Sequence, residues 1–179
     1  MAIAANIIII VLEVIGLYLS AKRGGWKILQ FYTQLSNIFA LLSSILFLLV
    51  GEKAAWLCYT AVCLLTMTFL VSLFILVPMG AGFKKMMLTN SGLFHHTLCP
   101  ILSFISYALW EPHASVWFLP VILTFIYGMI ILYLNWVEKI DGPYPFFRVR
   151  HQSALATVLW YVALTGTITL ISLAVIWLT

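Results

Sequence analysis

Charged residues are scarce in this sequence. Only 8% of its 179 residues are Asp, Glu, Lys or Arg, whereas about 25% of the residues in a soluble domain are charged. Hydrophobic residues make up 64% of the chain. So few charges exclude a soluble globular domain, because its water-exposed surface could not be built. The formal net charge of +4 comes from basic residues in short connections. Membrane topology explains those residues, and we expect no nucleic-acid partner.

Cysteine and histidine are also few, and they lack the spacing of disulfide frameworks or metal sites. The three cysteines, Cys58, Cys63 and Cys99, form no paired ladder, so we expect no disulfide framework. The neighbours His95 and His96 do not share a helical face, and no two histidines stand four positions apart. A metal or haem site is therefore a minor alternative, and we expect no bound cofactor.

Long apolar runs fill most of the chain. A stretch of about 20 apolar residues crosses the hydrocarbon core of a bilayer as a helix. We predict an all-α integral membrane protein, a bundle of about six helices in three hairpins within one transmembrane domain, residues 1–179. The first run has no basic segment before it, so we interpret it as a mature helix and not a signal peptide. The predicted spans are Ile3–Ser20, Ile28–Val50, Trp56–Pro78, Leu93–Trp110, Val116–Val137 and Ala154–Leu178.

The basic residues indicate how the helices are oriented. Lysine and arginine near the ends of membrane spans collect on the cytoplasmic side. Eight of the nine flank the first, third and fifth connections, and only Lys53 lies in the second. We therefore predict a multi-pass protein of the cell (plasma) membrane with both termini outside. The eight residues are Lys22, Arg23, Lys27, Lys84, Lys85, Lys139, Arg148 and Arg150.

Polar side chains gather near the cytoplasmic ends of the predicted helices. At about 1.5 Å per residue, several of them lie at a common depth of about 10 Å. Ionisable and amide groups in a membrane usually face the interior of the bundle, so this layer is a candidate site in the cytoplasmic leaflet. We expect no comparable cluster in the outer halves of the helices. The layer consists of Glu13, Gln30, Thr33, Gln34, Asn37, His95, His96 and Asn135.

This layer contains the groups that nucleophilic chemistry requires. Gln30, Thr33 and Asn37 are spaced to share one stripe of the second predicted helix. A threonine hydroxyl needs an adjacent base, most often histidine, to remove its proton, and Thr33 and His95 could form that pair. Spacing alone does not rank the supporting groups. Candidates to orient the imidazole are Glu13, Asn37 and Asn135, and candidates to donate to an oxyanion are Asn37, Asn135 and Trp136.

Other interpretations of the same residues stay open. Threonine in a membrane helix often bonds a backbone carbonyl one turn back. Glu13 could relay protons, pair with His95, or pack as a protonated carboxyl. A proton-coupled transporter or a lipid-binding protein would use these groups without a covalent step. A lipid acyltransferase would use the same nucleophile, with a lipid alcohol in place of water.

Three parts of the chain carry motifs that stand in a fixed order. GGWK at residues 24–27 is followed by FYTQLSN at 31–37, LFHHTLCP stands at 93–100, and GPYPF stands at 142–146. Together they resemble the androgen-induced-gene family of membrane proteins, also called FAR-17a/AIG-like, and its bacterial relatives. LFHHTLCP is similar to the family's histidine segment, in which a histidine stands five residues before a proline, and GPYPF is similar to its Tyr-Pro-Phe loop. The resemblance runs from about residue 24 to residue 147 and covers most of the chain.

The resemblance implies an intramembrane hydrolase that takes a lipid substrate from the bilayer and cleaves the ester bond of fatty acid esters of hydroxy fatty acids. Residue by residue, the family's threonine falls on Thr33, and its histidine falls on His95, five positions before Pro100. Ser36 is the alternative nucleophile and His96 the alternative histidine. The expected reaction is acyl transfer in two steps, in which His95 deprotonates Thr33 and water later releases the acyl group.

Overall fold

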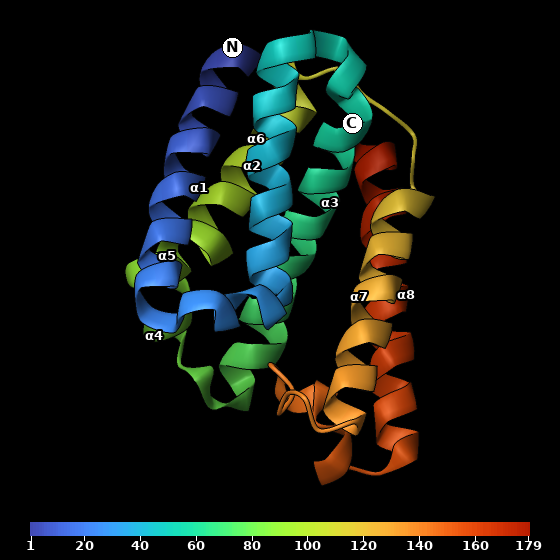
Figure 1. Ribbon diagram of the computed structural model, residues 1–179. Coiled ribbons are helices and arrows are strands. Elements are labelled where there is room, and N and C mark those ends of the chain that lie inside the picture. The colour runs from blue at the N-terminus through green and yellow to red at the C-terminus, as the bar shows by residue number, and fades with distance from the viewer.

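The computed structural model describes all 179 residues and contains helices and connections but no strand. Its long helices lie side by side (Figure 1), which confirms the predicted all-α membrane fold. Five segments are long and apolar enough to cross a membrane, and the longest, Tyr32–Ala81, contains two helices that run in opposite directions. The long helices are α1 (Ala2–Gly24), α2 (Tyr32–Val50), α3 (Ala55–Val71), α6 (Cys99–Trp110), α7 (Phe118–Trp136) and α8 (Ala154–Leu178).

Glycines end the first two helices. Gly25 follows α1 with a φ of 52°, and Gly51 follows α2 with a φ of 61°. Residues with a side chain rarely adopt this left-handed region, so glycine lets the chain leave the helix at these points. After Gly51, a turn of 3-10 helix, η2 (Gly51–Ala54), leads directly into α3.

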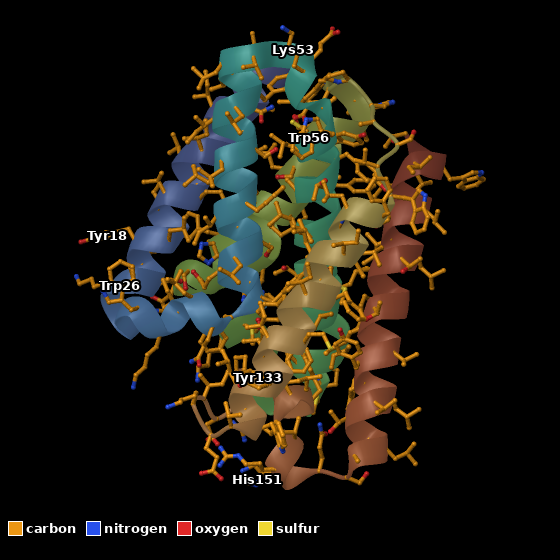
Figure 2. All side chains as sticks on the ribbon, turned by 45° about the vertical axis from the view of Figure 1, so that its right-hand side comes forward. Tyr18, Trp26, Lys53, Trp56, Tyr133 and His151 are labelled. Carbon is orange, nitrogen blue, oxygen red and sulfur yellow. The ribbon has the colours of Figure 1, made fainter.

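The second membrane helix begins later than predicted. Residues 25–30 form a separate 3-10 helix, η1 (Gly25–Gln30), and α2 starts only at Tyr32. Trp26 in η1 is 88% exposed and points away from the bundle, on the same side as Tyr18 (Figure 2). The predicted stripe is therefore wrong for Gln30, which is not part of α2, because the extended backbone at Phe31 separates η1 from α2.

Helix α3 lies at the centre of the bundle. It packs against α2 and α6 on one side and against α7 and α8 on the other. Helix α1 completes a four-helix group by packing against α2 and α6, and α7 and α8 form a pair beside it. Large apolar side chains are exposed on the outward faces of the other long helices, whereas α3 exposes only Trp56. This is expected for helices that surround a central helix and face lipid.

The two ends of the bundle differ in charge. Both chain termini lie toward one end (Figure 1), and Lys53 lies there too, whereas His151 lies at the opposite end (Figure 2). The remaining lysines and arginines lie in or beside the connections at that opposite end. We call the two ends the termini end and the basic end.

Two π-helical segments lie near the basic end. The segment η3 (Ser72–Ala81) continues α3, and η4 (Phe94–Leu98) precedes α6. The backbone hydrogen bonds of a π-helix span one residue more than those of an α-helix, so successive side chains face different directions from those in an α-helix. Such segments often occur at functional sites. Here they carry Ser72, His95 and His96.

The termini end contains a polar cluster, so the expectation that the outer halves lack one is wrong. Asn6 Nδ2 donates to Glu111 Oε1 at 2.8 Å, and Ser106 Oγ donates to the same oxygen. All three side chains are buried. Asn6 lies 105 positions from Glu111 in the sequence, and Ser106 lies five positions before it. Glu111 follows the last residue of α6, and its side chain is buried in the bundle instead of standing in a solvated loop.

Candidate functional site

Two pockets meet at Thr33, near the basic end. The larger, which we call the basic-end pocket, has a cavity volume of about 610 Å³, and Arg23 and His96 are among its lining residues. The smaller, the apolar pocket, has a cavity volume of only about 40 Å³ and lies among α2, α3, α7 and α8. Thr33, Leu76 and Tyr144 line both pockets. Thr33 therefore stands where a polar pocket meets an apolar one.

Hydrogen bonds hold Thr33 in the first turn of α2. Its backbone N–H donates to Tyr144 Oη at 3.2 Å, and its Oγ1 lies 3.2 Å from the same oxygen. Its carbonyl accepts from Asn37 Nδ2 at 2.6 Å and from Ser36 Oγ at 3.0 Å. The Thr33 hydroxyl makes no bond to a carbonyl one turn back, which is the usual structural use of threonine in a helix. Its Oγ1 is instead presented toward Tyr144 at the junction of the pockets.

Tyr144 reaches the site from the connection between α7 and α8. Its ring is buried, lies nearly parallel to Phe146 at 5.2 Å between centroids, and meets Phe31 edge-on at 5.8 Å. Burial raises the pKa of the Tyr144 phenol, so the hydroxyl keeps its proton at neutral pH. It can donate that proton to Thr33 Oγ1 while accepting from the Thr33 N–H. The hydroxyl proton of Thr33 then stays free for a base.

His95 is sealed between helices and lines neither pocket. It is 1% exposed. Gln34 Nε2 donates to its Nδ1 at 3.0 Å, and its Nε2 lies 3.9 Å from Glu13 Oε2. Since an amide nitrogen only donates, Nδ1 accepts, and the single proton of a neutral ring lies on Nε2, facing Glu13. Both ring nitrogens are thus directed at buried side chains, and no hydrogen bond joins His95 to Thr33.

Gly16 makes room for His95 against α1. A Cβ atom added at Gly16 would lie 2.5 Å from His95 Nε2 and 2.9 Å from the Cβ of Phe94. Those separations are far below van der Waals contact, so any side chain at this position would displace the imidazole. The close approach of η4 to α1 therefore requires glycine here.

His96 faces the basic-end pocket that Thr33 also lines. Its Nδ1 is hydrogen-bonded to Ser72 Oγ at 2.6 Å, and its Nε2 has no hydrogen-bond partner. Ser72 is the first residue of η3 and is 1% exposed. When Ser72 accepts the Nδ1 proton, Nε2 presents a lone pair to the pocket. His96, and not His95, is thus the imidazole that shares a cavity with Thr33.

Five side-chain atoms with no accessible surface lack a hydrogen-bond partner, and all five lie in this half of the bundle. Most belong to the group formed by Glu13, Gln34 and His95, and Glu13 is 0% exposed with neither oxygen bonded. A buried polar atom without a partner is rare in proteins and points to a proton, a water molecule or a functional role. The atoms are Glu13 Oε1 and Oε2, Gln34 Oε1, Asn37 Oδ1 and His95 Nε2.

The structure brings some of the predicted supporting residues to the site and not others. Asn37 lies one turn from Thr33 and is fully buried. Asn135 is also buried, but its side chain bonds backbone groups of the connection that follows α7. Trp136 is 71% exposed. Neither Asn135 nor Trp136 lines a pocket at Thr33. Asn135 instead stabilises the connection after α7, and Trp136 faces outward.

Sequence reasoning did not single out Tyr144 or Ser72. The signal for Tyr144 was its place in the GPYPF segment, which was read as a motif without a role for the phenol. Ser72 lies in an apolar run and gave no signal. Arg23 was interpreted only as a topology marker, yet it lines the basic-end pocket and donates to Ser91 Oγ and to the Leu19 carbonyl.

No group of three or more His, Cys, Asp or Glu side chains in the structure is placed to hold a metal ion. Comparisons of the chain with protein-family models, with curated proteins and with solved structures find no match.

Proposed function

We propose that this protein is an intramembrane hydrolase that cleaves an acyl ester of a membrane lipid, with Thr33 as the nucleophile. The observation that carries the proposal is the position of Thr33 between an apolar and a polar pocket. An ester has the same division, because its acyl chain is apolar and its carbonyl and alcohol sides are polar. The substrate class implied by the family resemblance is a fatty acid ester of a hydroxy fatty acid.

The chemistry proceeds in two steps. Thr33 Oγ1 attacks the ester carbonyl, its proton passes to an imidazole, and the oxyanion is stabilised by a hydrogen-bond donor. The protonated imidazole then gives its proton to the leaving alcohol. Water, deprotonated by the same imidazole, attacks the acyl-threonine and releases the fatty acid and free Thr33. The Tyr144 phenol, which keeps its proton, is the donor placed at Thr33.

The base belongs to the pair His95 and His96. His95 is the residue that the sequence predicts, but it would have to release Gln34 before its Nδ1 could accept a proton. His96 already lines the basic-end pocket, and its Nε2 makes no hydrogen bond. The geometry therefore favours His96 as the base, with Ser72 holding its ring and His95 packed behind it.

The basic residues support an orientation with the basic end toward the cytoplasm of the cell, both termini outside, and the site in the cytoplasmic leaflet. Arg23 at the basic-end pocket would face an anionic group on the polar side of the substrate. Water enters from the same end to complete hydrolysis. If a lipid alcohol entered instead, the same site would act as an acyltransferase.

Labelling with a fluorophosphonate probe tests the nucleophile. Purified wild-type protein in detergent should be labelled covalently and should hydrolyse a model fatty ester. Thr33→Ala should lose both, and Thr33→Ser should keep labelling, because serine retains the hydroxyl. Undiminished labelling of Thr33→Ala would rule out Thr33 as the nucleophile.

A second candidate function rests on one observation, the fully buried Glu13 carboxyl, neither oxygen of which makes a hydrogen bond. Buried carboxyls in membrane proteins commonly carry protons in transporters. A proton-coupled transporter would show substrate flux in liposomes that Glu13→Gln abolishes and that needs no covalent intermediate. Flux that survives this substitution, or no flux at all, would exclude this candidate.

A further inference from the structure

The polar cluster at the termini end encloses a small cavity. The cavity lies among α1, α2, α3 and α6 and has room for roughly one water-sized guest. It shares no lining residue with either pocket at Thr33. Its polar lining residues are Asn6, Ser43, Ser44, Cys58, Ser103 and Glu111.

The Glu111 carboxyl in this cavity has no basic partner. It is 9% exposed, and its Oε1 accepts hydrogen bonds from Asn6 and Ser106. No ion pair in the structure includes it, although both Lys53 and the N-terminal amine lie at this end. Its second oxygen, Oε2, makes no hydrogen bond. Since both hydrogen-bond donors bind Oε1, Oε2 is left without a donor at the cavity.

Two serine hydroxyls face the same cavity without partners. Ser44 is 5% exposed and Ser103 is 8% exposed, and neither makes a hydrogen bond within the protein. Serine in a membrane helix usually bonds a carbonyl one turn back, as Ser172 does at 2.8 Å. The lone pairs of Ser44 and Ser103 are therefore available to a guest, together with Glu111 Oε2.

We propose that this cavity binds a monovalent cation of the size of sodium through Glu111, Ser44 and Ser103. Hard cations take oxygen ligands. One carboxylate balances one positive charge, whereas a divalent ion would leave an uncompensated charge in the bundle. The bound ion would then link α2, through Ser44, to α6, through Ser103 and Glu111, at the termini end. The site is independent of ester hydrolysis at Thr33.

Thermal unfolding of the full chain in detergent tests this site. Wild-type protein should melt about 3 °C or more higher in sodium chloride than in choline chloride of equal ionic strength, because a ligand that binds only the folded state stabilises it. Potassium chloride should give a smaller rise, since a larger ion fits the cavity less well. Glu111→Gln should abolish the difference between sodium and choline, and Ser103→Ala should reduce it.

The difference between the two salts is the readout, so a lower melting temperature of a variant does not affect the test. Glu52→Gln is the matched control, because Glu52 is an exposed carboxyl in the turn η2 at the same end. It should keep the full sodium-dependent rise. No rise in wild type, or an equal rise in Glu111→Gln, would overturn the proposal and leave a cavity that holds water.

Discussion

The basic end and the termini end of this bundle both bury polar side chains, but they satisfy them differently. At the termini end, Asn6 and Ser106 donate hydrogen bonds to the Glu111 carboxyl beside a cavity with room for about one water-sized guest. At the basic end, Glu13 has no partner, and two pockets meet at Thr33. The unbonded oxygens at the termini end face only this small cavity, whereas the unbonded groups at the basic end lie near a pocket large enough for chemistry on a lipid. The difference teaches that burial of polar residues alone does not identify an active site in a membrane.

The largest effect should come from separating the two adjacent histidines. His96→Gln should lower kcat for a model fatty ester by about 10³-fold, in the range that general bases contribute, because it removes the free Nε2 from the basic-end pocket. His95→Gln, at a ring that lines no pocket, should lower it by less than about tenfold. Steady-state hydrolysis in detergent measures both. A larger loss of kcat in His95→Gln than in His96→Gln would identify His95 as the base.

Tyr144 should have the next largest effect. Tyr144→Phe removes the hydroxyl bonded to Thr33 while keeping the packed ring, so kcat should fall by about 10²-fold. The melting temperature should fall slightly, because the Thr33 N–H loses its acceptor. Tyr161→Phe is the control, because Tyr161 lines the apolar pocket but its hydroxyl bonds the Phe125 carbonyl. A control that loses as much activity as Tyr144→Phe would mean that the phenol has no specific role at Thr33.

Gly16 tests the packing behind the histidines. Gly16→Ala should lower the free energy of unfolding by about 1–3 kcal/mol, because its Cβ would overlap the His95 ring. Gly166 in α8 is the matched control, since a Cβ there meets nothing within 4 Å. Gly166→Ala should be neutral or slightly stabilising, as alanine favours a helix. Thermal unfolding of the two variants compares them, and equal stability would show that His95 is not tightly packed against α1.

The smallest effect is expected for Glu13→Gln. Gln keeps the shape of a neutral carboxyl and removes only the ability to ionise, so hydrolysis should change by less than about threefold. If Glu13 instead oriented a catalytic His95 as a carboxylate, the loss should approach about 10⁴-fold, as for other enzymes whose orienting carboxylate is replaced. The rate of hydrolysis by Glu13→Gln therefore shows whether the buried pair of Glu13 and His95 takes part in catalysis.

Most of the fold could be predicted because hydrophobic length is a strong signal in a membrane. Each of the six predicted spans overlaps a long helix of the structure. The start of α2 was missed because Ile28 and Leu29 extend the apolar run, and only the extended backbone at Phe31 separates η1 from α2. The cluster around Glu111 was missed because its members are isolated along the chain and meet only when α1 packs against α6.

The candidate site could be predicted only in part. Helical rise placed Glu13, Thr33 and His95 at one depth, and the structure buries all three. Which histidine faces the pocket could not be predicted, because an α-helical rotation does not apply to the π-helical segment η4. The contact between Tyr144 and Thr33 joins residues 111 positions apart through an irregular connection, and no local pattern predicts such a contact.

The most direct test of the central claim is to find the acylated residue. Wild-type protein incubated briefly with a fatty ester, quenched in acid and digested, should yield one acylated peptide by mass spectrometry. Fragmentation should place the acyl group on Thr33, and His96→Gln should reduce the amount formed. An acyl group on Ser36 or Ser72, or turnover of the ester without any acylated peptide, would contradict Thr33 as the nucleophile.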